Sequence, residues 1–219
     1  MNRAADRVLE SIVVIAKEPL AGKVKTRLIG TVSADQAAAL AAAALTDTLR
    51  ALATVPCRNR ILLFDGCPTQ WLPPGWTLIE QTSGELDQRL AAGFSLLPDG
   101  PAVLVGMDTP QVVPAHLEFD HTRFDACLGL ADDGGYWAIG FREPARAAEV
   151  ILGVPMSRSD TGSVQHDRLR AAGMSVQLLA ELVDVDTAED AHRVARDAPE
   201  TVFAQQWQLI ASDSLLAQR

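Results

Sequence analysis

The sequence alternates short apolar runs with longer segments of helical period, and this alternation constrains the fold more than any other feature. The runs that predict strands cover residues 11–16, 60–64, 77–80, 102–106, 125–130, 136–141 and 175–179. The segments that predict helices cover residues 33–52, 85–97, 145–152, 163–172, 187–196 and 200–216. Strands separated by helices need crossover connections, which favour a mainly parallel sheet with helices on both faces. We therefore predict a single Rossmann-like α/β domain over residues 1–219.

The predicted helix over residues 33–52 is rich in alanine. Ser33 and Gln36 match the S-x-x-Q capping box that starts many helices. Alanine is the best helix former, which is enough to explain the composition. A face of small residues also suits a contact between two copies of the helix, so a homodimer stays open as an alternative.

The composition excludes several classes of protein. Hydrophobic residues make up 48% of the chain, which indicates a packed core, and a net charge of −9 argues against a nucleic-acid binder. The apolar stretch from Ile12 to Ala16 is too short for a signal-peptide core, and no run approaches the ~20 residues of a membrane span. The 3 cysteines form no C-x-x-C pair, which disfavours disulfides and zinc and predicts a cytoplasmic protein.

All 3 lysines of the chain lie in the loop after the first predicted strand. Fixed cations, a flexible backbone and a hydroxyl in such a loop suit the binding of a di- or triphosphate. The loop is not a Walker A motif, because Val24 follows the Gly-Lys pair where Ser or Thr would be needed. A solvated basic loop is the alternative. The candidate phosphate-binding residues are Lys17, Gly22, Lys23, Lys25, Thr26 and Arg27.

Aspartates follow two of the predicted strands. In an open α/β sheet, ligands bind outside the carboxyl ends of the strands, and Asp108 follows the strand over residues 102–106. Asp184 and Asp186 follow the last strand and point to the same side of an extended segment. We expect Asp108 and Asp186 to face each other and to bind Mg²⁺ or Mn²⁺ through carboxylate oxygens. The alternative for Asp108 is a cap on the following turn.

The segment of residues 132–136, with the sequence DDGGY, follows the fifth predicted strand. Its two glycines allow positive φ and close approach of the backbone. Carboxylates and an aromatic ring beside them suit an acceptor or a sugar, but Asp-Gly-Gly is also strong hairpin chemistry, and the two interpretations are compatible. The candidate acceptor-binding residues are Asp132, Asp133, Gly134, Gly135 and Tyr136.

Four motifs resemble, in the same order, those of a known bacterial family: KEPLAGKVKTRL, GMDTP, DDGGYWAIG and DVDTAED. That family consists of transferases of the glycosyltransferase-A type, with a nucleotide-diphospho-sugar-transferase-like fold. It is distantly similar to phospholactate guanylyltransferase. The similarity runs from about Ile12 to Asp190, which is most of the chain. It implies a fold and a reaction class and leaves the substrate open.

The resemblance also implies roles at the matching positions. The four cations Lys17, Lys23, Lys25 and Arg27 would contact the phosphates of a nucleotide. Asp108 and Asp186 would hold the metal. The segment of residues 84–89 resembles the G-D-L-G-E-R segment near the nucleoside, where Arg89 matches the family's arginine. Asp87 and Gln88 depart from that pattern.

These observations favour a Mg²⁺- or Mn²⁺-dependent nucleotidyltransferase that moves NMP from an NTP to a small, phosphorylated or hydroxyl acceptor with release of pyrophosphate. Lys25, Arg27 and Asp108 are its catalytic candidates. A glycosyltransferase that uses a nucleotide-sugar is the first alternative, with Asp132 or Asp133 as base. A non-catalytic nucleotide-binding protein is the second. Four cations suit a triphosphate better than a diphosphate. The expected partners are a nucleotide and a small acceptor, without nucleic acid or membrane.

Overall fold

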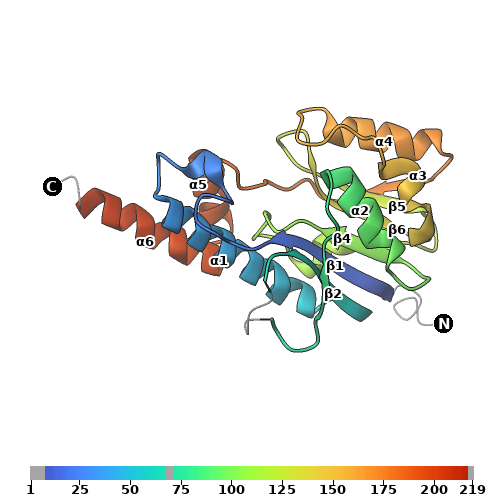
Figure 1. Ribbon diagram of the computed structural model, residues 1–219, viewed down its shortest axis with the longest axis horizontal. Coiled ribbons are helices and arrows are strands. Elements are labelled where there is room, and N and C mark those ends of the chain that lie inside the picture. Colours follow the sequence, from blue (N-terminus) through green and yellow to red (C-terminus); the bar gives the residue numbers. More distant parts are fainter. Residues whose placement is uncertain (1–7, 68–71, 217–219) are drawn as a thin grey trace.

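The computed structural model describes residues 8–67 and 72–216, and a seven-stranded sheet forms its centre (Figure 1). The strand order is β3-β2-β1-β4-β6-β5-β7. All neighbouring strands are parallel except the two pairs that include β6. The strands are β1 (Leu9–Lys17), β2 (Cys57–Asp65), β3 (Thr77–Glu80), β4 (Ala102–Val105), β5 (Ala126–Leu130), β6 (Tyr136–Phe141) and β7 (Val176–Leu178). The predicted mainly parallel sheet is confirmed.

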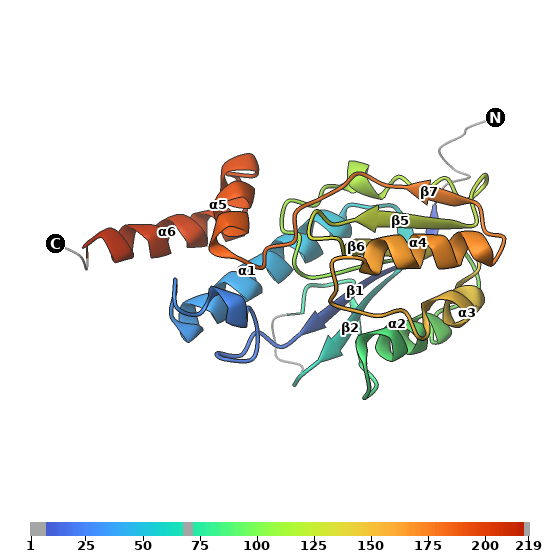
Figure 2. The same ribbon diagram turned by 90° about the horizontal axis from the view of Figure 1, so that it is seen from above.

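Helices cover both faces of this sheet, as the sequence predicts (Figures 1 and 2). Helix α1 packs on one face, and α2, α3 and α4 pack on the other. Helices α5 and α6 pack against the first half of α1 in a third core cluster. The helices are α1 (Ala34–Ala53), α2 (Leu86–Ser95), α3 (Ala147–Ile151), α4 (Thr161–Ala171), α5 (Ala188–Asp197) and α6 (Val202–Leu216), with 3-10 turns η2 (Thr26–Leu28), η3 (Pro114–Leu117) and η4 (Pro144–Arg146). No helix in the described ranges is long and apolar enough to cross a membrane.

Strand β1 shows why its sequence is apolar almost throughout. Ile12 and Val14 belong to the core cluster beneath α1, whereas Val13 between them belongs to the cluster beneath α2. A central parallel strand is buried on both faces, so its sequence is a continuous apolar run rather than an alternating pattern.

The ends of several helices are fixed by side chains. The Ser33 hydroxyl accepts a hydrogen bond from the Gln36 backbone N–H at 3.1 Å, and the Gln36 side chain accepts one from the Ser33 N–H at 2.8 Å. The predicted capping box is therefore confirmed. Asp47, buried within α1, accepts hydrogen bonds from the backbone N–H groups of Val202 and Phe203 at 3.0 and 2.8 Å. This long-range contact fastens the start of α6 to α1.

The strand order changes direction between β1 and β4, which lie side by side in the sheet. The chain proceeds from β1 to β2 and β3 on one side, and from β4 to the remaining strands on the other. Such a switch point leaves a crevice outside the carboxyl ends of its two central strands. The fold therefore places a ligand site after Lys17 and after Val105, where the sequence carries its lysines and Asp108.

Candidate functional site

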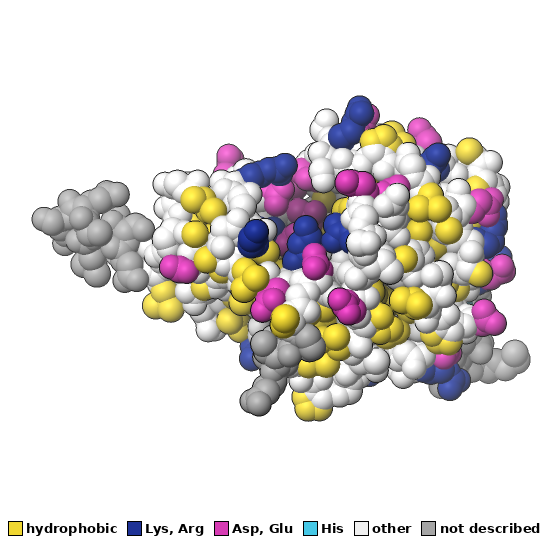
Figure 3. Space-filling model, viewed as in Figure 1, with side chains coloured by type: hydrophobic (Ala, Val, Ile, Leu, Met, Phe, Trp, Pro, Cys, Tyr) yellow, Lys and Arg dark blue, Asp and Glu magenta, His cyan; other side chains and the backbone are white. Residues whose placement is uncertain are grey.

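A pocket of about 1090 Å³ lies at the carboxyl ends of β1 and β4. This volume is near the upper end of the roughly 300–1,000 Å³ of small-molecule sites, so a nucleotide and a second molecule can share it. Figure 3 shows basic and acidic side chains gathered around a hollow on this face of the molecule. Segments from both halves of the sheet line it, including the loops after β1 and β4 and the start of β6.

The basic loop enters the pocket from the end of β1. Lys17, Lys23, Lys25, Thr26 and Arg27 all belong to its lining. The loop is held by core contacts, because Val24 and Leu28 are almost fully buried. Gly22 is outside the lining and adopts a φ of 75° in the turn before Lys23. The structure therefore gathers the predicted phosphate-binding residues at one site, except for Gly22, which shapes the loop.

Lys25 has the most constrained side chain of the loop. Its side chain is 6% exposed, and its ammonium lies 2.6 Å from Asp108 Oδ1 and 3.5 Å from Asp186 Oδ1. Burial alone would lower the pKa of Lys25, but Asp108 and Asp186 outweigh it and raise that pKa above its ordinary value. Its φ of 48° is unusual for a residue with a side chain, and such backbone strain is concentrated at functional sites. Lys25 is thus a buried, charged group between the two predicted metal ligands.

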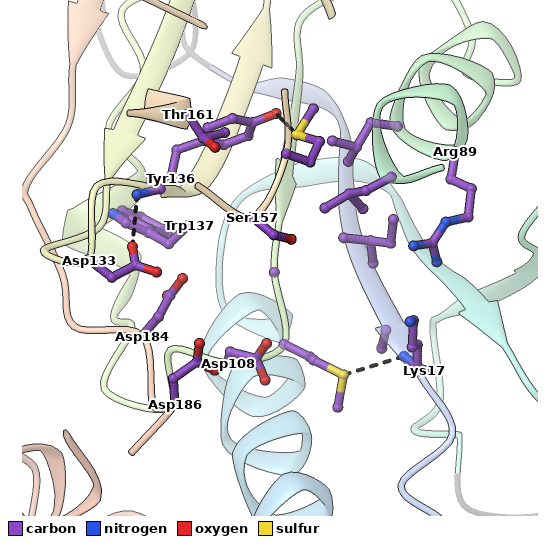
Figure 4. Close-up of a pocket in the computed structure, with 18 of the residues that line it drawn as sticks. Lys17, Arg89, Asp108, Asp133, Tyr136, Trp137, Ser157, Thr161, Asp184 and Asp186 are labelled. Carbon is purple, nitrogen blue, oxygen red and sulfur yellow. Dashed lines mark hydrogen bonds between the residues drawn. The ribbon is translucent and has the colours of Figure 1, made fainter. Parts of the chain in front are cut away.

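The carboxylates are brought together by the backbone. The Val185 N–H donates to the Asp108 carbonyl oxygen at 3.0 Å, and the fully buried Val185 leaves its neighbours Asp184 and Asp186 to face the pocket. Arg27 forms an ion pair with Asp186. Burial and the nearby Asp108 raise the pKa of Asp184 to about 7. Asp108, Asp184 and Asp186 together form an acidic group that we call the carboxylate cluster (Figure 4).

The predicted acceptor segment is divided by the structure. Asp133, Gly135 and Tyr136 line the pocket, whereas Asp132 and Gly134 do not. Asp132 forms an ion pair with Arg193 of α5. The Asp133 carboxylate accepts a hydrogen bond from the Gly135 N–H at 2.8 Å, which confirms turn chemistry here without removing Asp133 from the pocket.

Arg89 projects from α2 toward Lys17, on the side of the pocket opposite the carboxylate cluster (Figure 4). Its Nη1 donates to Gln81 Oε1 at 2.8 Å, while Gln81 Nε2 donates to the carbonyl oxygens of Ala16 and Leu63 at 2.7 and 3.0 Å. Gln81 is thereby fixed to β1 and β2 and orients the guanidinium. The buried Arg89 Nε has no hydrogen-bond partner within the described residues.

The departures from the family pattern in the segment of residues 84–89 have structural roles. Gln88 Oε1 accepts a hydrogen bond from the Glu85 N–H at 3.1 Å in the capping box of α2. Asp87 Oδ2 accepts one from the Gly153 N–H at 2.7 Å. Asp87 therefore joins α2 to the segment of residues 153–161, which closes one side of the pocket.

Sequence reasoning missed that segment and Gln81. Residues 154–159 and Thr161 line the pocket, although they lie between α3 and α4, far from the four motifs. Their sequence, VPMSRSDT, carries no periodic or charge signal. Gln81 could have been found, because it directly follows β3 and therefore lies at the same edge of the sheet as Lys17.

The sequence pattern of the family described as "Uncharacterized protein conserved in bacteria (DUF2064)" matches residues 34–158. The chain belongs to this family. No curated protein matches the chain in sequence. The family membership and the fold together confirm the resemblance predicted from the four motifs.

Solved structures share the fold over nearly the whole chain. A candidate nucleotide-diphospho-sugar transferase from Desulfovibrio desulfuricans G20 is 28% identical, with a TM-score of 0.80, and the match covers 96% of this chain and 98% of that one. The 2-C-methyl-D-erythritol 4-phosphate cytidylyltransferase from Thermus thermophilus is 14% identical, with a TM-score of 0.51 and coverage of 93% and 99%. CMP:2-keto-3-deoxy-manno-octonic acid synthetase complexed with CTP is 13% identical, with a TM-score of 0.54 and coverage of 87% and 99%. The last two likenesses establish the nucleotide-diphospho-sugar-transferase-like fold alone.

Proposed function

We propose that the protein is a nucleotidyltransferase that moves the NMP group of an NTP to a small acceptor and releases pyrophosphate. The observation that carries the proposal is the arrangement of charge at the switch point between β1 and β4. Cations of the basic loop and Arg89 lie in the same pocket as the carboxylate cluster. Two of the structural neighbours described above are a cytidylyltransferase and a synthetase complexed with CTP, which supports a nucleotide as substrate.

Two carboxylates of the cluster, Asp108 and Asp186, fit a divalent cation that substrate phosphates also bind. The carboxylates of Asp108 and Asp186 lie close enough to contact one ammonium group, at 2.6 and 3.5 Å from Lys25 Nζ. Mg²⁺ prefers such oxygen ligands and is commonly held by one or two carboxylates together with substrate phosphates. Among the described residues, no group of three or more His, Cys, Asp or Glu side chains is placed to hold a metal ion. The proposal therefore gives the ion two protein ligands, Asp108 and Asp186, and takes its other ligands from the substrate phosphates. A bound Mg²⁺ or Mn²⁺ would neutralise phosphate charge as it develops.

The residues of the chain would divide the remaining tasks. Lys17, Lys23 and Arg89 bind phosphate oxygens and orient the triphosphate. An acceptor oxygen bonds to the α-phosphorus, the bond from that phosphorus to the pyrophosphate oxygen breaks, and pyrophosphate leaves. Where the acceptor is an alcohol, its proton passes to the carboxylate of Asp133, which faces the pocket. Positioning and fixed charge supply most of the rate in such transfers.

Transfer of a sugar from a nucleotide-diphospho-sugar is the second candidate. It is favoured by the likeness to the candidate transferase from Desulfovibrio desulfuricans G20, which is the most extensive of the three described. The two reactions differ in the bond broken, since sugar transfer releases a nucleoside diphosphate and leaves the two phosphates joined.

The test is a panel of the four NTPs and several nucleotide-sugars with Mg²⁺ or Mn²⁺. Binding is measured by thermal shift, because a ligand that binds only the native state must raise its stability. Turnover is measured as pyrophosphate or nucleoside diphosphate released with a library of alcohol and phosphate acceptors. Pyrophosphate supports the proposal, and a nucleoside diphosphate supports the second candidate. Binding without either product indicates a non-catalytic nucleotide-binding protein.

Asp108→Asn and Asp132→Asn form a matched pair for this assay. Both replace one aspartate with a residue of the same size, but Asp108 lines the pocket and Asp132 is paired with Arg193 outside it. Asp108→Asn should lower turnover by at least 100-fold, which corresponds to roughly 2.7 kcal/mol of transition-state stabilisation. Asp132→Asn should retain it. Equal activities would remove the carboxylate cluster from the reaction.

A further inference from the structure

One wall of the pocket is apolar. Its side chains belong to the pocket lining and to the core cluster beneath α2, α3 and α4 or pack against that cluster, and they are Ile15, Leu86, Leu90, Leu104, Tyr136, Ile139 and Met156. Leu90, Leu104 and Ile139 are buried, whereas Leu86, Tyr136 and Met156 are only partly buried. Partly buried apolar side chains inside a pocket leave apolar surface for a ligand to cover.

Two of these side chains contact each other at the end of the pocket near α4. The Tyr136 hydroxyl donates to Met156 Sδ at 3.8 Å, and burial raises the pKa of Tyr136, so this phenol stays neutral. Figure 4 shows Tyr136 and Thr161 at one end of the pocket, well apart from Lys17. The Thr161 hydroxyl is used within its own segment, since it donates to the Pro155 carbonyl oxygen at 2.8 Å. This end therefore offers mainly apolar contacts.

The charges of the pocket are sorted by position, apart from Lys25 and Arg27, which are paired with the carboxylate cluster. Lys17 and Arg89 lie on one side, and Asp133 lies with the carboxylate cluster on the other (Figure 4). The cation that the segment of residues 154–159 contributes to the lining is Arg158, and its guanidinium is paired with Asp160 at 2.9 and 3.0 Å. A phosphate group near Tyr136 would meet the carboxylate of Asp133 without a free cation from this segment. The apolar end thus disfavours a charged acceptor.

We propose that the wall at Tyr136 and Met156 is the acceptor subsite, and that the acceptor is an uncharged alcohol with an apolar body. This inference rests on the proposed function, and it narrows the acceptor from a phosphate or hydroxyl compound to a neutral hydroxyl compound. The apolar body covers the wall, and the hydroxyl lies toward Asp133 and the α-phosphate. The nucleoside occupies the opposite side, where Gln81 orients Arg89.

Simple probes test the subsite in the full-length protein. They are 2-naphthylmethanol, its phosphate ester and glucose, and their Kd values are measured by calorimetry. We expect 2-naphthylmethanol to bind at least 10-fold more tightly than its phosphate ester, and glucose not to bind. A Met156→Gln variant keeps the length of the side chain but makes it polar. It should raise the Kd for 2-naphthylmethanol about 10-fold, since the apolar contact with the methionine side chain is lost.

A matched variant controls for stability, and the Kd for NTP controls for the identity of the occupant. Leu152→Gln changes an exposed apolar residue outside the pocket in the chain just before the segment, and it should leave every Kd unchanged. The Kd for NTP should stay constant in Met156→Gln, because the proposed nucleotide site lies on the other side of the pocket, at Arg89 and Lys17 (Figure 4).

Three results would overturn the assignment. Tighter binding of the phosphate ester would show that the acceptor is anionic. A loss of NTP affinity in Met156→Gln would show that the wall holds the nucleobase. NTP binding without binding of 2-naphthylmethanol would refute the acceptor subsite and leave the proposed function standing, whereas a failure of every NTP and nucleotide-sugar to bind would refute the proposed function itself.

Discussion

Replacement of Gly134 by alanine should destabilise the protein and disturb the pocket together. A Cβ atom at Gly134 would lie 1.9 Å from the carbonyl oxygen of Ser159, which is backbone and cannot rotate away. Gly134 also has a φ of 90°, in the region that favours glycine. Its carbonyl oxygen accepts a hydrogen bond from the Gly162 N–H at 2.8 Å, which fixes the start of α4 against the turn. The substitution must push this contact apart.

The expected magnitude has two parts. A residue with a side chain in the left-handed region costs about 1–2 kcal/mol. Overpacking against fixed neighbours costs about 1–3 kcal/mol more. The free energy of unfolding should therefore fall by about 2–5 kcal/mol, and the Tm should fall by roughly 4–20 °C for a domain of this size.

Gly75→Ala separates the two parts. Gly75 has a φ of 84°, close to that of Gly134, but an added Cβ there meets nothing within 4 Å. This control should lose only about 1–2 kcal/mol. Urea unfolding followed by far-UV circular dichroism gives the free energy of each variant by linear extrapolation. Of the two variants, only Gly134→Ala should also raise the Kd for 2-naphthylmethanol. The turn that contains Gly134 contacts Ser159, in the segment that carries Met156, whereas Gly75 does not.

Equal destabilisation of the two variants, within about 0.5 kcal/mol, would refute the contact between the turn and Ser159 as a source of strain. Unchanged binding of 2-naphthylmethanol in a clearly destabilised Gly134→Ala would refute the link between that turn and the pocket.

Three further predictions concern single side chains. Arg89→Met should raise the Kd for NTP, measured by calorimetry, about 10-fold or more, since hydrogen bonds from a charged donor are worth roughly 1.5–3 kcal/mol. The control Arg50→Met, on α1 and outside the pocket lining, should leave that Kd unchanged. Asp47→Ala should lower the free energy of unfolding by about 1–2 kcal/mol in urea, because two backbone N–H groups at the start of α6 lose their acceptor. Hydrogen bonds from Ser175 hold the pKa of Asp125 below its ordinary 3.8, so the stabilisation is present above about pH 4 and is lost as the pH falls through the lowered value. Asp125→Asn should therefore be less stable than the wild type at pH 7, and the difference in urea midpoint should shrink between pH 4 and pH 2.

The arrangement of helices and strands could be predicted because each element carries a local signal. Strands buried on both faces have continuous apolar sequences, and Ser33 with Gln36 marks the start of α1. One predicted helix, over residues 145–152, is instead a 3-10 turn followed by α3. Pro144 sets that beginning, since proline is tolerated only where a backbone N–H would be unpaired. Propensity and periodicity are local properties, and they account for this success.

The site could be predicted only in part, because its contacts join distant segments. The loops at the carboxyl ends of the strands follow from the topology, and so does their convergence. The sequence pattern did not reveal that Asp132 pairs with Arg193, or that Asp87 reaches Gly153. The glycines at 134 and 135 are an example. Close approach of the backbone was predicted there, but at Gly134 the neighbour is Ser159 of the same chain. Such tertiary contacts leave no periodic signal.

The cations of the pocket differ in whether they form ion pairs with carboxylates. Of the six cations in the pocket lining, Lys25 and Arg27 are already paired with the carboxylate cluster, and Arg158 is paired with Asp160. Among the described residues, no carboxylate forms a salt bridge with Lys17, Lys23 or Arg89.

The pocket thus contains two kinds of cation with different tasks. The paired cations hold Asp108 and Asp186 in place. Asp184 adds a third carboxylate that is only partly ionised near pH 7, so the cluster keeps an excess of at most one negative charge. Burial, together with the nearby carboxylates of Asp108, Asp133 and Asp186, raises the pKa of Asp184 to about 7. A phosphate would be repelled from the cluster and attracted to the unpaired cations. Under the proposed function, this charge distribution would direct a triphosphate to the side of Lys17, Lys23 and Arg89, and a divalent cation would join it to the carboxylate cluster.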